Sequence, residues 1–231
     1  MNILTVSGPP SSGKTSVILK VMESLKQRGI KGAVFKFDCL HTDDDALYEK
    51  AGIPVKKGLS GSLCPDHYFV SNIEEVVEWG LEIGVDLMIT ESAGLCNRCS
   101  PYIKDIKAMC VIDNLSGINT PKKIGPMLKT ADIVIITKGD IVSQAEREVF
   151  ASKVGSVNPK AITMHVNGLN GQGAYELSTL LYEKEAHDTV KGKKLRFPMP
   201  AALCSYCLGE TRIGEAYQMG NVRKVDMGEV K

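Results

Sequence analysis

The sequence has no long apolar run and almost no net charge. No apolar stretch approaches the roughly 18 residues that a membrane-spanning helix needs. Its first residues have the pattern of a core strand, not of a signal peptide. Basic and acidic residues nearly balance, at a formal net charge of +1, so the charge does not favour nucleic acid or a membrane surface as a partner. We therefore expect a cytoplasmic protein that binds neither.

The chain also lacks internal repeats and low-complexity segments. Its 231 residues are 43% hydrophobic, enough for the full core of one α/β domain. Strand-like and helix-like patterns alternate from Met1 to Ala186, which predicts a mostly parallel sheet covered by helices on both faces. The expected strands are 1–6, 32–37, 85–90, 108–113, 133–136 and 161–166. The expected helices are 14–28, 43–51, 72–83, one from 121, 143–154 and 173–186. We read 1–186 as the main domain and 187–231 as a small appended element.

The most informative motif is G-x-x-x-x-G-K-T at residues 8–15, directly behind the apolar run 2–6. A strand that runs through a glycine-rich loop into a helix is typical of a P-loop, whose backbone N–H groups cradle phosphate. Lys14 is expected to reach the β and γ phosphates, and the Thr15 hydroxyl to bind Mg²⁺. The predicted phosphate-binding residues are Gly8, Ser11, Ser12, Gly13, Lys14, Thr15 and Ser16.

Two acidic residues follow predicted strands, at the sheet edge where open α/β proteins bind ligands. Asp38 ends the second strand and is expected to reach Mg²⁺ directly or through water. Glu91 opens the stretch Glu91-Ser92-Ala93-Gly94 and is expected to hold the Mg²⁺ shell or to orient the attacking water. We predict Lys14, Asp38 and Glu91 as the catalytic residues of nucleotide hydrolysis.

A base-recognition motif follows the strand 133–136, as Thr137-Lys138-Gly139-Asp140. The Asp140 carboxylate can accept hydrogen bonds from N1–H and the exocyclic amine of guanine. Adenine offers neither donor and would leave the carboxylate unpaired. The Lys138 stem can cover the base, and Asn167 ends the last strand within reach of the guanine carbonyl. The sequence therefore predicts GTP as the nucleotide.

Cysteines point to a second kind of chemistry, because seven are present and four of them form C-x-x-C pairs. Structural disulfides are not expected in a cytoplasmic protein. Cys64 and His67 place a thiolate and an imidazole three residues apart, and both suit Ni²⁺ or Zn²⁺. Cys96 and Cys99 follow the loop that is expected to move with the γ phosphate. With the tail pair Cys204 and Cys207, they could supply four thiolates to Zn²⁺ or to a [4Fe–4S] cluster.

These motifs together resemble the GTPases that deliver nickel to hydrogenase and urease, the HypB/UreG type. The likeness covers residues 1 to about 185 and lies in seven segments: 8–15, 37–45, 51–55, 64–67, 91–94, 137–140 and 168–173. It implies a GTP-dependent homodimer that holds metal near the dimer interface and works with a client metalloenzyme or another accessory protein. Threonine stands at 137 where the family has asparagine, and residues 64–67 are one residue longer than the urease-type C-P-H. Cys96 and Cys99 form a pair where the hydrogenase type has one interface cysteine, and the tail 187–231 with Cys204 and Cys207 has no counterpart.

Two other functions fit the same residues. One is an iron–sulfur ATPase or GTPase that activates electron transfer or assembles clusters. The other is a non-catalytic metal-binding regulatory module that uses nucleotide as a structural ligand. The sequence leaves the metal, the client and the oligomer open.

Overall fold

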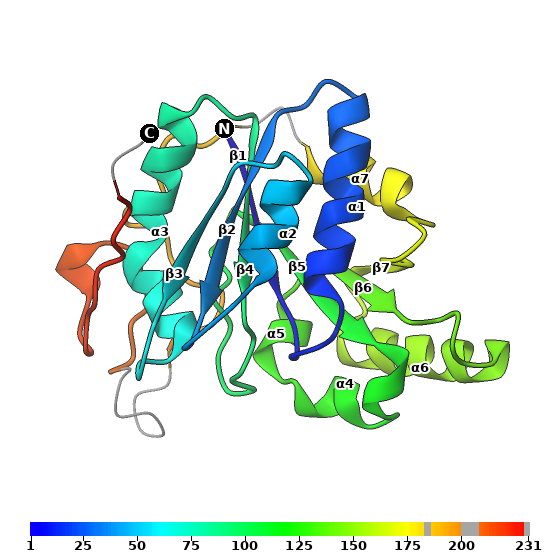
Figure 1. Ribbon diagram of the computed structural model, residues 1–231. Coiled ribbons are helices and arrows are strands. Elements are labelled where there is room, and N and C mark those ends of the chain that lie inside the picture. The colour runs from blue at the N-terminus through cyan, green and yellow to red at the C-terminus, as the bar shows by residue number, and fades with distance from the viewer. Residues whose placement is uncertain (183–185, 200–207, 229–231) are drawn as a thin grey trace.

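A seven-stranded, all-parallel sheet forms the centre of the computed structural model, which describes residues 1–182, 186–199 and 208–228 (Figure 1). The strand order is β3-β2-β4-β1-β5-β6-β7. The strands are β1 (Asn2–Ser7), β2 (Gly32–Asp38), β3 (Val55–Leu59), β4 (Leu87–Ser92), β5 (Lys107–Asp113), β6 (Ile133–Thr137) and β7 (Ile162–His165). All six strand pairings run parallel, so the carboxyl ends of the strands meet at one edge of the sheet.

Helices cover both faces of the sheet. One face packs against α1 (Lys14–Gln27), α2 (Asp44–Lys50) and α7 (Ala174–Leu181). The other packs against α3 (Pro65–Glu82), α5 (Pro126–Lys129) and α6 (Gln144–Val157), with the short α4 (Thr120–Lys123) beside α6. Two 3₁₀ turns, η1 (Asn114–Ser116) and η2 (Glu215–Tyr217), complete the described elements. Every residue of β6 is buried, as its unbroken apolar run predicts for a strand covered on both faces.

The expected α/β architecture is confirmed, with local differences. The helix expected from 121 is two short helices, α4 and α5, and α7 ends at Leu181. Two further differences concern β3 and α3. The edge strand β3 was not expected, because Val55-Lys56-Lys57-Gly58-Leu59 contains two lysines and a glycine. Lysines suit an edge strand, where they discourage pairing with another chain. The second difference is α3, which begins at Pro65 and not at Asn72, with Cys64 as its N-cap. Proline is favoured in a first helical turn, so Pro65 was a usable signal.

The described part of the C-terminal segment packs directly on the α3 face of the sheet. Val190, Leu195, Met199 and Ile213 are buried in the same cluster as α3 and β2. Arg196 forms two short bonds to the carboxylate of Asp132, at 2.7 and 2.6 Å. Ordinary apolar packing therefore holds these residues, and the boundary at 186/187 stays a prediction. Cys204 and Cys207 lie outside the described residues. Within the described ranges, no helix is long and apolar enough to span a membrane.

Candidate nucleotide and metal sites

The glycine-rich loop lies between the carboxyl end of β1 and the start of α1, at the bottom of Figure 1. Gly13 has a left-handed φ of 89°, and α1 begins directly behind it. The buried Lys14 Nζ donates to the carbonyls of Gly8 (3.0 Å) and Pro9 (2.9 Å), and burial lowers the pKa of Lys14. Ser12 Oγ is buried without a hydrogen-bond partner among the described residues. A buried cation and an unpaired hydroxyl in one loop fit a bound phosphate.

Glycines let three segments meet at this loop. A Cβ on Gly8 would lie 2.0 Å from the carbonyl oxygen of Val111 in β5. A Cβ on Gly94 would lie 1.8 Å from the carbonyl oxygen of Gly8. Both distances are far below van der Waals contact, and both glycines have a positive φ. The loop that begins at Glu91 is therefore packed backbone to backbone against the P-loop.

A buried network of charges lies behind the loop, at the ends of β2 and β4. Thr15 Oγ1 lies 2.9 Å from Glu91 Oε1 and 3.1 Å from Asp44 Oδ2. Lys36 Nζ lies 2.7 Å and 2.6 Å from the same two oxygens, and Tyr48 donates to Glu91 Oε2 at 2.7 Å. Burial alone would lower the pKa of Lys36, but the two carboxylates outweigh it and raise that pKa. Glu91 is fully buried, and these three side chains satisfy the hydrogen-bonding capacity of its carboxylate.

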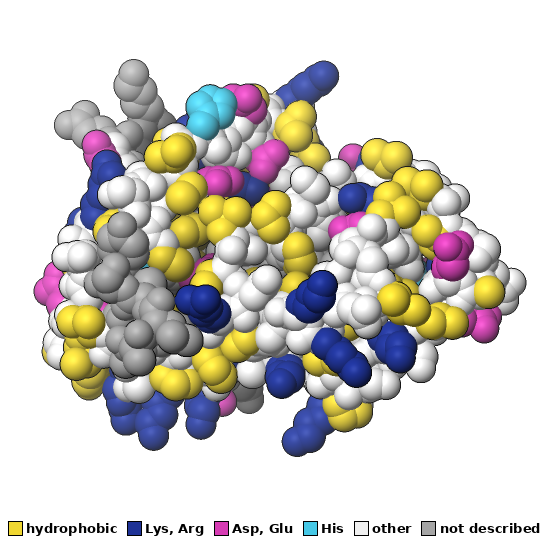
Figure 2. Space-filling view, turned by 90° about the horizontal axis from the view of Figure 1, so that it is seen from below, with side chains coloured by type: hydrophobic (Ala, Val, Ile, Leu, Met, Phe, Trp, Pro, Cys, Tyr) yellow, Lys and Arg dark blue, Asp and Glu magenta, His cyan; other side chains and the backbone are white. Residues whose placement is uncertain are grey.

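Asp38 completes the acidic side of the network, with a carboxylate oxygen 4.0 Å from Lys36 Nζ. A cleft of about 520 Å³ opens in front of these groups. Its lining includes Ser11, Gly13, Lys14, Thr15, Ser16, Lys36, Asp38, Asp44, Glu91 and Lys138. One hydroxyl and three carboxylates on one wall are the oxygen donors that Mg²⁺ prefers. Seen from below, several lysine and arginine side chains lie in the lower half of Figure 2, and acidic side chains lie mainly above and at the edges.

A second, smaller cavity of about 180 Å³ adjoins the first and is the candidate base pocket. It is lined by Gly13, Ser16, Thr137, Lys138, Asp140, Ile141, Asn167, Gly168 and Leu169. Two contacts tie the base loop to the P-loop: Thr137 Oγ1 donates to the Ser12 carbonyl (2.6 Å), and Lys138 Nζ donates to the Ser11 carbonyl (2.8 Å). Asn167 Oδ1 accepts from the backbone of its own turn. The residues predicted for base recognition therefore line one cavity next to the phosphate loop.

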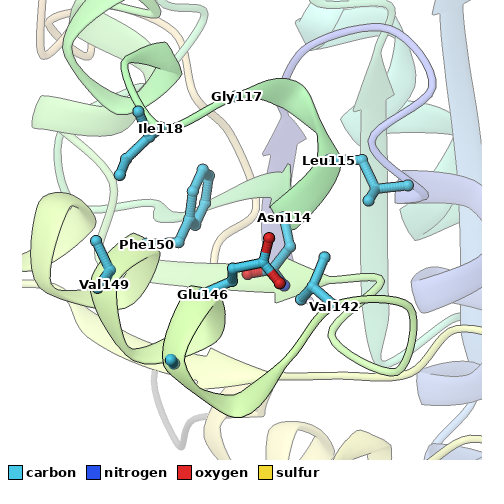
Figure 3. A pocket seen from close by; sticks show the side chains of 9 residues that line it. Asn114, Leu115, Gly117, Ile118, Val142, Glu146, Val149 and Phe150 are labelled. Carbon is cyan, nitrogen blue, oxygen red and sulfur yellow. The ribbon is translucent and has the colours of Figure 1, made fainter.

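A cavity of about 500 Å³ lies on another side of the base loop, between η1 and α6. Figure 3 shows Phe150 rising from α6 toward Ile118 and Gly117. Most of the cavity wall is apolar. Its single titratable side chain, Glu146, accepts hydrogen bonds from Ser143 in the capping box at the start of α6. No group suited to phosphate or metal chemistry converges there among the described residues.

The cysteines predicted for metal come together from two separate segments. Ligand atoms of Cys64, Asp66 and Cys99 all lie within 4.8 Å of one another. Cys96 adjoins this group, because a side-chain hydrogen bond links it to Cys99. That bond lowers the pKa of Cys96 to about 6, whereas the neighbouring Cys64 and Cys96 sulfurs, together with burial, raise the pKa of Cys99. We call Cys64, Asp66, Cys96 and Cys99 the thiol cluster.

Asp66 connects the thiol cluster to the nucleotide site. Its Oδ1 accepts from Ser92 Oγ at 2.7 Å, and its Oδ2 accepts from Cys99 Sγ at 3.2 Å. Burial, reinforced by the nearby Cys64, raises the pKa of Asp66 to about 7. Ser92 is the residue after Glu91, so a single carboxylate touches both the nucleotide segment and the thiols.

His67 is not brought to the thiol cluster. Its Nε2 lies 2.8 Å from Glu210 Oε1, and both side chains are buried. Cys64 is the N-cap of α3 and His67 its third helical residue, and the imidazole is buried against Glu210 of the C-terminal segment. Glu210 also accepts from the backbone N–H groups of Met219 and Gly220. The His67–Glu210 pair therefore ties α3 to the C-terminal segment.

The sequence analysis missed four polar residues of these sites: Lys36, Asp44, Tyr48 and Asp66. Lys36 had a signal, because it is a lysine inside an otherwise apolar strand. Asp44 lies in the acidic stretch 37–45 that carries the family resemblance. Asp66 lies inside the segment 64–67, which also carries the resemblance. Tyr48 had no local signal, because its partner Glu91 is 43 residues away in the sequence.

The first strand of a parallel sheet runs through this loop into a helix, and the helix begins with a lysine and a threonine. These features define a P-loop nucleoside-triphosphate-binding protein. Residues 2–165 match the profile described as CobW/HypB/UreG, nucleotide-binding domain. The chain therefore belongs to the CobW/HypB/UreG family, the P-loop GTPases of the HypB/UreG type.

Relatives and solved structures agree with this membership. The chain is 47% identical over 226 residues to the Methanocaldococcus jannaschii protein MJ0120, covering 98% of this chain and 97% of the relative. It is 31% identical over 191 residues to the urease accessory protein UreG of Edwardsiella ictaluri, covering 76% and 90%. The fold is similar to that of HypB from Helicobacter pylori in complex with nickel, with a TM-score of 0.63, 18% identity and coverage of 81% and 92%.

Proposed function

We propose that this protein is a GTP-hydrolysing metallochaperone that binds a transition metal and assists the maturation of a metalloenzyme. One observation carries the proposal: Asp66 bonds to Ser92, next to Glu91 of the nucleotide site, and to Cys99 of the thiol cluster. A metal held by the cluster would thus lie one hydrogen bond from the segment that responds to the nucleotide.

The nucleotide roles follow from the residues that line the two cavities. The glycine-rich loop with Lys14 binds the phosphates. Thr15, Asp38 and Glu91 would hold Mg²⁺, which supplies positive charge at the phosphates. Asp140 would select guanine, with Thr137, Lys138 and Asn167 around the base. The chemistry is positioning and charge neutralisation, so turnover of the isolated protein should be slow and should rise with a partner or with metal.

The metal cargo would be bound by the thiol cluster. Three thiols and a carboxylate supply four donors, a set that suits Zn²⁺ and other borderline-soft ions. We place nickel first, because relatives include urease accessory proteins and a HypB structure contains nickel. Cys204 and Cys207 stay predicted ligands. His67 stays a predicted ligand that would first have to leave Glu210.

The same relatives favour hydrogenase or urease as the kind of client, and a homodimer as the working form. An accessory protein or the client itself would be the partner. We propose a cytoplasmic location and no nucleic-acid or membrane partner, consistent with the balanced charge.

The test is metal affinity in two nucleotide states. Ni²⁺ and Zn²⁺ are titrated into the reduced protein with GDP and with a non-hydrolysable GTP analogue. We expect the two states to differ by about 5- to 150-fold, the usual range of such coupling. Cys64→Ser should weaken binding. The matched control is Cys39→Ser, because Cys39 bonds to the Gly61 carbonyl and is not in the thiol cluster. Equal affinities in both states would contradict the metallochaperone proposal.

A second candidate is an iron–sulfur protein that transfers electrons or assembles clusters, favoured by three cysteines that converge from two segments. Anaerobic purification followed by iron, sulfide and metal analysis separates it from a nickel or zinc carrier. A protein that binds metal and nucleotide but never hydrolyses GTP, with metal and partner present, would instead be a regulatory module.

A further inference from the structure

Lys36 is a buried cation in the place where the proposed Mg²⁺ ligands converge. Its side chain is 4% exposed, and its Nζ lies 2.7 Å from Glu91 Oε1 and 2.6 Å from Asp44 Oδ2. The hydroxyl of Thr15, the Mg²⁺-binding residue of the P-loop motif, lies 2.9 and 3.1 Å from those same two oxygens. The ammonium and the hydroxyl therefore share one pair of carboxylate oxygens.

Lys36 offsets part of the negative charge that three carboxylates bring to this point. Glu91 is fully buried, and Asp44 and Asp38 are partly buried beside it. Three lysines line the cleft. Lys14 and Lys138 donate to carbonyls of the glycine-rich loop, so among the three Lys36 is the cation that touches the carboxylates directly. A divalent cation entering without a nucleotide would have to displace this ammonium or sit against it, and like charges at such distances repel strongly in a buried site.

We propose that Lys36 is a positioning residue, an internal counter-ion that keeps Glu91 and Asp44 paired until a metal-bound nucleotide arrives. Mg²⁺ then binds together with the triphosphate, whose negative charge offsets the added cation, and does not bind alone. The inference rests on the proposed function, in which Thr15 and Glu91 hold Mg²⁺. It adds that binding of the metal is conditional on the nucleotide.

The test uses Mn²⁺ as a spectroscopic substitute for Mg²⁺ and the full-length protein without nucleotide. Mn²⁺ prefers oxygen ligands, so it reports on the carboxylates and not on the thiol cluster. Electron paramagnetic resonance counts free and bound Mn²⁺. We expect weak binding by the wild type, and binding about tenfold tighter or more by Lys36→Met, because the substitution removes a unit charge in direct contact with two carboxylates.

Three further variants make the result specific. Lys57→Met is the matched control, because Lys57, like Lys36, pairs with an aspartate of α2: its Nζ lies 2.6 Å from Asp45. Lys57 is far more exposed than Lys36 and does not line the cleft. This variant should bind Mn²⁺ as the wild type does. Lys36→Arg keeps the charge and should keep binding weak. Adding Glu91→Gln to Lys36→Met should remove the gain.

Wild-type-like Mn²⁺ affinity in a folded Lys36→Met protein would overturn the inference. Tight Mn²⁺ binding by the nucleotide-free wild type would overturn it as well, and that measurement needs no variant to fold. A separate titration of GDP into the wild-type protein distinguishes failure of the proposed function from failure of the role proposed for Lys36. If the wild-type protein binds no GDP, the proposed function is contradicted. The Mn²⁺ measurements are made without nucleotide, so they still decide the role of Lys36.

Discussion

Substitution of Gly94 by alanine should uncouple the Glu91 loop from the P-loop. The new Cβ would lie 1.8 Å from the carbonyl oxygen of Gly8, whereas real Cβ atoms essentially never come within 3.0 Å of another heavy atom. The two backbones must therefore move apart by roughly the difference between these distances. Displacements of about 1 Å at a site that positions its ligand can cost about 100-fold in function. We expect GDP affinity to fall by about tenfold or more.

Backbone strain has to be separated from this clash, and the chain provides the control. Gly94 has a φ of +68° and Gly52 one of +69°. Alanine at either position costs about 1–2 kcal/mol in the left-handed region. No described atom lies within 4 Å of a Cβ at Gly52, so Gly52→Ala has the strain without the clash. Both variants should lose roughly 2–4 °C of melting temperature per kcal/mol.

The assay is thermal unfolding of wild type, Gly52→Ala and Gly94→Ala, with fluorescent GDP titrated into each. Gly52→Ala should bind GDP with wild-type affinity, whereas Gly94→Ala should bind it about tenfold more weakly or worse. The two variants could instead bind GDP with affinities within about twofold, a difference of about 0.4 kcal/mol in binding free energy. That result would refute the claim that close packing of the Glu91 loop against the P-loop is needed for nucleotide binding.

Three more substitutions test other parts of the sites. Lys14→Ala should abolish GTP hydrolysis and greatly weaken GDP binding, because the phosphates lose their nearest cation; unchanged turnover would show that the loop does not bind phosphate as proposed. Asp140→Asn should shift preference toward xanthine nucleotides, and equal wild-type affinity for ATP and GTP in calorimetry would remove the guanine assignment. Ser92→Ala removes the hydroxyl that bonds to Asp66 and should reduce the coupling between metal and nucleotide from about 1–3 kcal/mol toward zero; undiminished coupling would show that it takes another route.

Much of the nucleotide site could be predicted because its residues are local in the sequence. The segment Gly8 to Thr15 is contiguous, so its glycines, lysine and threonine define a phosphate loop without knowledge of the rest of the chain. Asp140 follows an apolar strand, and parallel strands bring their carboxyl ends to one edge, so alternation alone predicted that it would approach the same ligand. The same alternation predicted a mostly parallel sheet; the observed sheet is parallel throughout, and its lysine-bearing edge strand β3 was missed.

The thiol cluster and the charge network were decided by tertiary structure. Cys64 and Cys99 are 35 residues apart in the sequence and meet because the start of α3 lies near the loop that follows β4, whereas His67 pairs with Glu210 of the C-terminal segment. Lys36 and Glu91 are 55 residues apart, and the register of β2 against β4 pairs them directly. A residue's type sets what it can bind, but burial and neighbours set which partner it has. Sequence determined that this chain carries a phosphate loop and thiols of a kind suited to metal, and the fold decided that one carboxylate, Asp66, would contact both the thiols and the segment after Glu91.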